Sequence, residues 1–480
     1  MHLQNQIFSM LAFLSDILPT ADLSTTALVL FIVCIVAVAA FEFVNGFHDT
    51  ANAVATVIYT KSLKPVPAVV WSGVWNFLGV LTGGIAVAMS IINLLPLDGL
   101  MDKPLYENIA IIIAMLFTAI FWNLLTWYYG IPCSSSHTLI GSLIGGGLGF
   151  QYIHGGTGVN WSKASDIGLS LLLSPAFGFS MVILLMFLMR ILIKDIKIFK
   201  EPEGDSPPPV WIRGILILTC TAVSYSHGSN DGQKGVGLLM VILLTFAPMQ
   251  YAINTEINPT QVSQNLTTIQ EVLTRQAEKN SLKAADLNAS VAKIEGIKSD
   301  LVNIATADQK MKFSVRKRLQ DLRKKEVGEY VKDATLISDE QDRKTLKTAL
   351  ADLTPFTDFA PFWVVLLISL SLGIGTMIGW KRIVLTIGEK IGKTHLTYAQ
   401  GAAAEITAAT TIGLSTGLGL PVSTTHVLSS GIAGSMVASN GLQNLQRGTI
   451  RNILLAWILT LPVTVGLAAA VFVILYKIMV

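Results

Sequence analysis

The chain has 480 residues, of which 52% are hydrophobic and only 14% are charged, and its net charge at neutral pH is +3. Soluble domains carry about 25% charged residues, so this composition excludes an ordinary soluble protein and is typical of a membrane protein. The small net charge, with no basic face along any segment, argues against a nucleic-acid partner. Three cysteines, Cys34, Cys133 and Cys220, lie in or beside apolar segments and are expected to be free thiols.

A helix needs about 20 apolar residues to cross the hydrocarbon core of a bilayer. We expect helices at the apolar runs of the chain, which are 25–45, 66–94, 108–129, 165–193, 211–225, 236–247, 360–380, 399–418 and 451–478. Two shorter, glycine-rich runs at 133–150 and 422–440 each follow a proline. The sequence therefore predicts an all-α polytopic membrane protein.

Charged residues concentrate in one block, 249–358, which holds 17 of the 34 Lys and Arg residues and 16 of the 31 Asp and Glu residues. Apolar residues in this block keep helical spacing, as at Val291, Ile294 and Ile297. We expect a small helical soluble insertion here, and the simplest interpretation gives it no part in the chemistry.

Basic residues indicate which loops face the cytoplasm, because Lys and Arg collect in short cytoplasmic loops. The basic clusters are Lys61 with Lys64, the segment 190–213, the segment 381–393, and Arg447 with Arg451. Placing them inside puts the charged block outside the cytoplasm. The chain then divides into an N-terminal membrane repeat at 1–193, a cytoplasmic linker at 194–210, the start of a C-terminal membrane repeat at 211–248, an extracytoplasmic insertion at 249–358 and the rest of the C-terminal repeat at 359–480.

Two polar motifs each occur twice in the chain. The first pair is "NGFHDTANA" at 45–53 and "HGSND" at 227–231, which share one pattern with His and Asn exchanged. The second pair is "GIPCSSSHTLIG" at 130–141 and "GLPVSTTHVLSSG" at 419–431. The loops give the two members of each pair opposite orientations. Two motifs repeated in the same order and in opposite orientation predict two inverted-topology repeats, an architecture of secondary transporters.

The polar residues of these motifs predict an anion site. Asp49 and Asp231 lie in apolar surroundings, where an ionised Asp costs about 2.5–3.5 kcal/mol, and their equivalent places in two repeats favour function over structural pairing. In the second motif a proline ends one segment and a hydroxyl caps the next helix, so a helix starts within the membrane. Helix starts bind anions, and the hydroxyl donors here are Ser134, Ser135, Ser136, Ser423, Thr424 and Thr425.

The same residues limit the kind of anion, because two carboxylates would repel a fully ionised one. Hydrogen phosphate carries its own O–H donor, and an accompanying proton or sodium ion offsets charge, whereas sulfate has no proton to donate near neutral pH. Lys234 is expected to extend to the membrane interface rather than to contact phosphate. Four histidines are candidate proton carriers or, as an equal alternative, caps of neighbouring helices: His48, His137, His227 and His426.

These motifs resemble those of the inorganic phosphate transporter (PiT) family, and look closest to its bacterial low-affinity phosphate permeases. The four paired motifs carry the resemblance through both halves of the chain, and it extends to "GTMIGWKRIVLTIGEKIG" at 375–392. It implies a multi-pass secondary transporter of the bacterial inner membrane, with two inverted repeats and re-entrant helical hairpins, that imports inorganic phosphate by cation symport.

The resemblance also implies the roles of individual residues. By position, the substrate site consists of Asp49, Asn52, Ser134, Ser135, Ser136, Asp231, Ser423, Thr424 and Thr425. The coupling ion or proton is assigned to Asn45, His48, Asp49, His227, Asn230 and Asp231, with His137 and His426 supporting the hairpins. The first motif pair, at 45–53 and 227–231, is called the two signatures below, and the second pair the two hairpin motifs. Much of the family has Gly-x-Asn-Asp in both signatures, but the first signature here has His48 before Asp49. Exchanging an amide for a titratable group favours protons over sodium as the coupling ion.

The expected partners are inorganic phosphate, the coupling cation and the lipid bilayer, and the sequence leaves a homodimer open. No nucleic acid, no cofactor beyond the coupling ion (H+ or Na+), no catalytic residue and no metal ligand is expected. Transport of sulfate, or of a neutral metal–phosphate complex, by the same fold is the alternative. An enzyme is not expected, because "GLSTG" at 413–417 lies in an apolar helical run, without the strand that precedes a Gly-x-Ser-x-Gly nucleophile.

Overall fold

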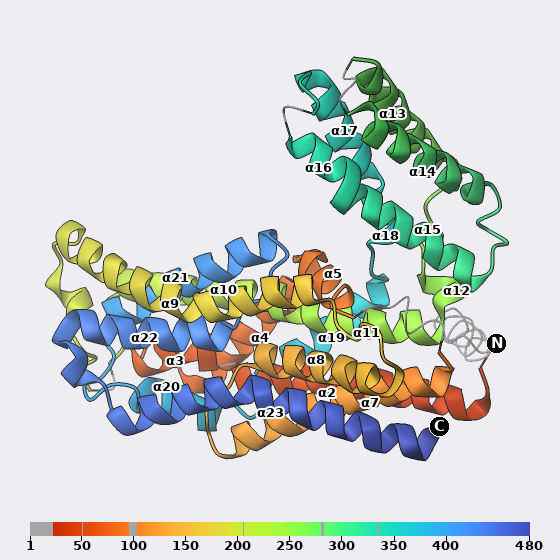
Figure 1. The fold of residues 1–480 in the computed structure, drawn as a ribbon. Helices are drawn as coiled ribbons and strands as arrows, with labels where there is room; N and C mark the ends of the chain where they lie inside the picture. Colours follow the sequence, from red (N-terminus) through yellow and green to blue (C-terminus); the bar gives the residue numbers. More distant parts are fainter. Residues whose placement is uncertain (1–22, 50, 96–102, 205, 280–282, 334–335) are drawn as a thin grey trace, which may run out of the picture. The chain divides into compact units, whose positions relative to one another are not determined.

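A computed structural model of the protein describes residues 23–49, 51–95, 103–204, 206–279, 283–333 and 336–480. The regular elements of these segments are all helices (Figure 1), as the sequence predicts. The chain forms two compact units: unit 1 comprises Met1–Ile242 with Ala360–Val480, and unit 2 comprises Leu243–Phe359.

The helices of unit 1 follow the apolar runs of the sequence. They are α2 (Thr25–Asp49), α3 (Ala51–Tyr59), α4 (Pro65–Thr82), α5 (Ala86–Ile92), α7 (Leu105–Tyr128), α8 (Ser135–His154), α9 (Trp161–Leu192), η1 (Ile196–Phe199), α10 (Val210–His227), η2 (Gly228–Gly232), α11 (Gln233–Phe246, which ends in unit 2), α19 (Phe362–Thr376), α20 (Lys381–Glu389), α21 (Tyr398–Gly417), α22 (Thr424–Asn440), η4 (Leu442–Asn444) and α23 (Arg447–Met479). One prediction is wrong: the run 66–94 is not one helix. It breaks after α4, where Gly84 has φ +80°, a conformation that other residues rarely adopt.

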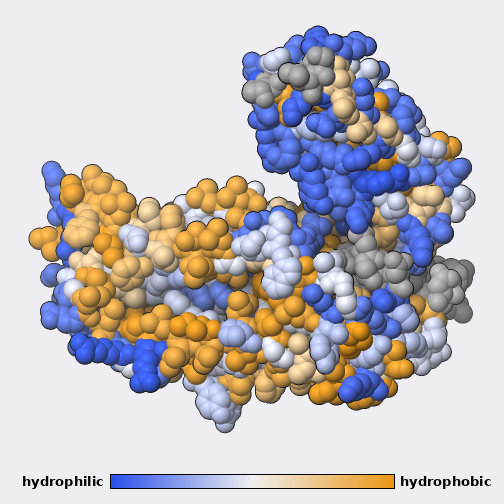
Figure 2. Space-filling view, in the orientation of Figure 1, coloured by the Kyte–Doolittle hydropathy of each residue, from blue (hydrophilic) through white to orange (hydrophobic). Residues whose placement is uncertain are grey.

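Five helical segments among the described residues are long and apolar enough to cross a membrane: Thr25–Tyr59, Pro65–Thr82, Leu105–Tyr128, Trp161–Leu192 and Arg447–Met479. Large apolar side chains on their outer faces are exposed, including Leu172 at 72% and Ile458 at 68%. Figure 2 shows these faces of unit 1 as broad hydrophobic areas. Such areas are stable in contact with lipid, where apolar side chains need no water.

The helices of unit 1 pack in matching pairs. The first signature helix, α2, packs against α19, whereas the second, formed by α10 and η2, packs against α4. Likewise α8 packs against α23, its neighbour in Figure 1, and α22 packs against α9. Gly46 and Gly228 permit the first two contacts, because a Cβ at either position would collide with backbone atoms of α19 or α4. Each pairing joins a helix of the N-terminal half of the chain (1–193) to a helix that follows residue 209.

The starts of α8 and α22 are built alike. Gly130 and Gly419 have φ values of +65° and +68°, which ends the preceding helix. Ser134 then caps α8 by accepting a hydrogen bond from the His137 backbone N–H, and Ser423 caps α22 through the His426 backbone N–H, both at 3.1 Å. The prediction that both motifs start helices with a hydroxyl cap is therefore confirmed.

Unit 2 consists of α12 (Pro248–Tyr251), α13 (Pro259–Lys279), α14 (Ala284–Val302), α15 (Gln309–Asp321), η3 (Leu322–Glu326), α16 (Val327–Lys332), α17 (Glu340–Asp352) and α18 (Thr354–Thr357). It has its own apolar core, in which Leu266, Ile294 and Leu319 are fully buried, and its visible surface is largely hydrophilic (Figure 2). The backbone N–H of Asn254 donates to Phe356 O at 2.9 Å, which joins the two ends of the unit. The sides of the membrane assigned to 194–210 and 249–358 stay predictions.

Candidate functional site

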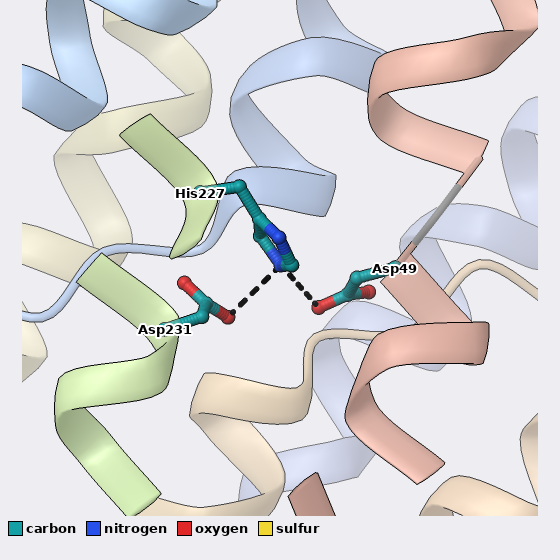
Figure 3. Close-up of side chains that lie close together, drawn as sticks. All are labelled: Asp49, His227 and Asp231. Carbon is teal, nitrogen blue, oxygen red and sulfur yellow. Dashed lines mark ion pairs between the residues drawn. The ribbon is translucent and has the colours of Figure 1, made fainter. Parts of the chain in front are cut away.

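The two signature aspartates lie on either side of one histidine nitrogen (Figure 3). His227 Nε2 is 3.8 Å from Asp49 Oδ2 and 3.7 Å from Asp231 Oδ2. Asp49 comes from the end of α2, His227 from the end of α10, and Asp231 from η2. All three side chains are at most 2% exposed. The π-helical turn of η2, a feature often found at functional sites, carries Asp231.

A neighbouring amide determines which nitrogen of His227 carries a proton. His227 Nδ1 lies 2.6 Å from Asn76 Oδ1, while the Asn76 amide nitrogen donates to Ser72 O at 3.0 Å. Because the amide oxygen can only accept, Nδ1 carries the hydrogen. Nε2 of neutral His227 then presents a lone pair to two carboxylates, and it has no hydrogen-bond partner within the described segments. This geometry favours a positive charge at Nε2, supplied by a proton or by a bound cation.

Asp49 is also held by the second hairpin motif and by its own neighbour. Thr425 Oγ1, in the first turn of α22, donates to Asp49 Oδ1 at 2.7 Å. His48 Nδ1 lies 3.2 Å from the same oxygen, and His48 Nε2 lies 3.2 Å from Thr126 Oγ1 of α7. Thus Asp49 joins α2, α10 and α22, and His48 links this cluster to α7.

Lys234 contradicts the expectation from the sequence, because it does not extend to the membrane interface. It is 2% exposed, and its Nζ lies 2.7 Å from Asp231 Oδ1. The same ammonium donates to Ser136 Oγ of α8 and to Val422 O at 3.0 Å. The sequence analysis did not predict this burial, because two of the three acceptors, Ser136 and Val422, lie 98 and 188 positions away from Lys234 in the chain.

The hydroxyls of the hairpin motifs are all buried, and matching positions at the two helix starts have matching roles. Ser134 and Ser423 cap their helices, while Ser136 and Thr425 contact the signatures. Thr424, at the start of α22, is 1% exposed. Ser135 Oγ, at the start of α8, is buried and has no hydrogen-bond partner in the part of the chain that the structure describes. It is therefore a candidate ligand for an anion at this helix start.

The rings of the two hairpin histidines are in contact, with centroids 4.5 Å apart and planes tilted by 36°. His137 Nδ1 also lies 2.8 Å from Ser134 Oγ, the cap of α8. His426 stacks on Trp457 of α23 with ring centroids 4.0 Å apart. These contacts are of the kind expected for residues that support the hairpins.

The signature asparagines contact neighbouring groups rather than His227. Asn45 Nδ2 donates to Glu42 Oε2 at 3.2 Å. Asn230 holds the loop before α22, since its Nδ2 donates to Leu420 O at 3.2 Å and its Oδ1 accepts from Val422 N at 3.2 Å. Asn230 is thus placed to position the second hairpin start. The side chain of Asn52 lies outside the described part of the structure.

Two buried residues near the site, Asn76 and Glu42, were missed by the sequence analysis, and a third, Lys234, was given the wrong surroundings. Asn76 could have been found as one of only two side-chain amides in the apolar run 66–94, the other being Asn93 near its end. The place of Lys234 in the site could have been predicted by aligning the signatures, because it follows Asp231 by three positions, as Asn52 follows Asp49. Glu42 lies one helical turn before Asn45 and packs against Gly235 of α11.

The triad of Asp49, His227 and Asp231 has ligand types that bind cations. One atom from each residue lies within 4.8 Å of the others, so the three could hold a metal ion. Carboxylates bind hard cations, and an imidazole nitrogen adds affinity for transition metals. The sequence analysis assigned these three residues to the coupling ion or proton and named no metal ligand.

Comparisons with known proteins agree on the kind of protein this chain resembles. A sequence model described as the phosphate transporter family, PHO4, matches residues 45–468. The low-affinity inorganic phosphate transporter PitA of Escherichia coli (strain K12) is 40% identical over 471 residues, covering 90% of this chain and 94% of PitA. A low-affinity inorganic phosphate transporter of Buchnera aphidicola subsp. Acyrthosiphon pisum is 40% identical over 463 residues, with the same coverage.

A solved structure shares the fold. It is described as "The sodium-dependent phosphate transporter", has a TM-score of 0.54 and 22% sequence identity, and the match covers 94% of this chain and 100% of that one.

Proposed function

We propose that this chain, which belongs to the phosphate transporter family, imports inorganic phosphate by symport with a cation, and that the cation is a proton rather than sodium. As a member of this family the chain is an integral membrane transporter and not an enzyme. The observation that carries this proposal is the position of His227 Nε2 between the two signature aspartates, at 3.8 and 3.7 Å. Phosphate binds beside this cation site, at the starts of α8 and α22.

The architecture we propose is two inverted repeats with re-entrant hairpins. The matching pairs of helices support it: the signature of each half packs against a helix of the other half, as in α2 with α19 and α10 with α4. The hairpin helices follow the same rule, α8 packing against α23 and α22 against α9. Secondary transporters of this type bind substrate between the repeats.

The phosphate site rests on two capped helix starts. Backbone N–H groups at a helix start carry partial positive charge and bind anionic oxygens. Ser135 supports the assignment, because its buried hydroxyl is unpartnered among the described residues. Asp49 or Asp231 would accept a hydrogen bond from the O–H group of hydrogen phosphate. This last argument favours phosphate over sulfate, which has no O–H group near neutral pH.

The charges in the site support cation symport. Asp49 and Asp231 carry two negative charges and Lys234 one positive charge, all at most 2% exposed. One further positive charge balances these three residues, and His227 Nε2 is the basic atom between the carboxylates. A proton on this nitrogen would supply the charge. Sodium is the second candidate, because the solved structure that shares the fold is described as sodium-dependent.

The test is radiolabelled phosphate uptake into proteoliposomes, driven by a proton gradient alone or a sodium gradient alone. We expect uptake with the proton gradient, and at least about a tenfold loss in Asp49→Asn and in Asp231→Asn, because a charged hydrogen bond contributes about 1.5–3 kcal/mol. Asp166→Asn is the matched control, since this carboxylate is exposed on α9. Uptake with sodium alone would overturn the proton assignment. Absence of phosphate uptake by folded protein under both gradients would overturn the proposed function.

A neutral metal–phosphate complex is the second candidate cargo, and the ligand set of Asp49, His227 and Asp231 favours it. In such a complex the metal ion would lie among these three residues while its phosphate contacts the hairpins. The uptake assay separates the two cargoes by adding Mg²⁺ or a chelator. Phosphate uptake that needs the metal, with equal uptake of a labelled divalent ion, would favour the complex; uptake unchanged by chelation would exclude it.

A further inference from the structure

Lys234 is a buried cation whose donors are fully used. An ammonium group has three N–H donors. Here they point to Asp231 Oδ1 at 2.7 Å, Val422 O at 3.0 Å and Ser136 Oγ. Ser136 Oγ donates its own hydrogen to Val422 O at 2.7 Å, so it accepts from the lysine. No N–H group of Lys234 is left for an anion in this conformation.

The acceptors of Lys234 are the oxygen types that coordinate hard cations. A carboxylate, a hydroxyl and a backbone carbonyl surround the ammonium, and each comes from a different segment: η2, the start of α8 and the loop before α22. Transporters coordinate their coupling ions with carboxylates and with carbonyls of unwound backbone next to helix ends. The side chain of Lys234 therefore occupies a place with the ligands of a cation site.

The two signatures differ at this position. Aligning Asp49 with Asp231 puts Asn52 opposite Lys234, three residues after each aspartate. An asparagine side chain is a neutral amide with an oxygen acceptor, whereas a lysine side chain carries a positive charge. The second half of the molecule therefore carries a covalently attached charge where the first half carries an amide.

From these observations we propose that the Lys234 ammonium is a built-in cation that permanently fills one of two cation sites. The second half-site then takes no ion from solution, and coupling occurs through the Asp49 and His227 side alone. This inference rests on the proposed function and adds to it a stoichiometry, since one cation fewer moves with each phosphate than in a transporter with two open half-sites.

The experiment replaces Lys234 by asparagine, the residue of the equivalent position in the first signature. Phosphate uptake into proteoliposomes is measured at a fixed proton gradient while sodium replaces choline. We expect uptake by the wild type to be independent of sodium. In choline, the rate of phosphate uptake by Lys234→Asn should be at least about tenfold lower than that of the wild type, the factor that corresponds to one charged hydrogen bond. Sodium should restore this rate. Lys234→Met, which offers no oxygen ligand, should lose uptake without recovery.

A second readout does not depend on transport. In detergent, sodium should raise the melting temperature of Lys234→Asn and leave that of the wild type unchanged, because a ligand stabilises only the state that binds it. Lys163→Asn is the matched control: Lys163 also pairs with an aspartate three positions away, but on the surface of α9 at 3.4 Å.

The outcomes separate the possible roles of Lys234. Sodium-dependent recovery of uptake together with sodium-dependent stabilisation supports the built-in cation. A folded Lys234→Asn that responds to sodium in neither assay overturns it, and a rise in the phosphate KM alone would instead make Lys234 a phosphate ligand. If the wild type takes up no phosphate, the proposed function fails first, and the melting experiment still tests the cation site.

Discussion

Thr425 Oγ1 donates to Asp49 Oδ1 at 2.7 Å, although the two residues are 376 positions apart in the chain. Ser136, which takes the place of Thr425 in the first hairpin motif, contacts Lys234, and Lys234 pairs with Asp231. Each hairpin start therefore binds the signature of the opposite half. A motion that opens the site by moving one hairpin away from the opposite signature must break the hydrogen bond on that side.

The hydrogen bond between Thr425 and Asp49 is expected to matter for transport. Thr425→Val keeps the shape of the side chain but removes the donor to a charged, buried acceptor, which costs about 1.5–3 kcal/mol. We expect the initial rate of phosphate uptake in proteoliposomes to fall about 10- to 100-fold. Thr410→Val is the control, because the exposed Thr410 donates only to Ile406 O of its own helix at 2.8 Å. Equal rates for the two variants would contradict the role given to Thr425.

Asn76 is expected to act by positioning His227. Asn76→Leu removes the oxygen that accepts from His227 Nδ1 at 2.6 Å, so the ring can turn and Nε2 no longer stays between the aspartates. Loss of this bond should reduce uptake by at least about tenfold.

Asn76→Asp tests whether the acceptor, rather than packing, is what counts at this position. The aspartate keeps an oxygen facing Nδ1, so we expect it to retain more uptake than the leucine variant. If both variants lose uptake equally while remaining folded, Asn76 is needed for packing of α4 and not for the orientation of His227.

The sequence predicted the elements of the site better than their contacts. Hydrophobic runs and repeated motifs are local signals, and they correctly indicated the helices and the capped starts of α8 and α22. Contacts such as Lys234 with Val422 depend on how distant segments fold together, and no local pattern contains that information. Hence Lys234, with the general tendency of lysine to reach the interface, was assigned the wrong surroundings.

The break in the run 66–94 has a similar explanation. Apolar composition alone predicts one long helix there, because an isolated glycine inside an apolar run is weak evidence for a break. The conformation of Gly84, with φ +80°, ends α4 and permits α5 to begin at Ala86. A pair of glycines, Gly83 and Gly84, was the local signal that should have reduced the length of the predicted helix.

Labelling of introduced cysteines tests the predicted orientation. Thr348 is exposed on α17 of unit 2, and Lys200 is exposed in the segment 194–210. We expect an impermeant thiol reagent added to intact cells to modify Thr348→Cys and to leave Lys200→Cys unmodified until the cells are opened. The native cysteines, Cys34, Cys133 and Cys220, are buried and should contribute little background. Labelling of Lys200→Cys alone in intact cells would reverse the orientation.

Unit 2 is expected to lose stability in acid through Asp358. Burial alone would raise the pKa of this carboxyl, but Lys324 and Arg323 hold its pKa below the usual value. Arg323 Nη2 donates to Asp358 Oδ2 at 3.0 Å, and Gln320 Nε2 donates to Oδ1 at 2.8 Å. A carboxyl whose pKa is lower in the folded state stabilises that state above its unfolded pKa, and the contribution disappears as the pH falls through the folded pKa.

A fragment spanning 243–359 allows this prediction to be measured, because the unit has its own core and its ends are joined by the bond from Asn254 to Phe356. We expect the fragment to fold alone and its melting temperature to fall between neutral pH and about pH 3, where carboxyl groups take up protons. Asp358→Asn should lower the melting temperature at neutral pH and make it less sensitive to acid, since the substituted group no longer titrates. Asp352→Asn, at an exposed position, serves as the control. If Asp358→Asn kept the full acid sensitivity of the unsubstituted fragment, the acid response would have to come from carboxyl groups other than Asp358.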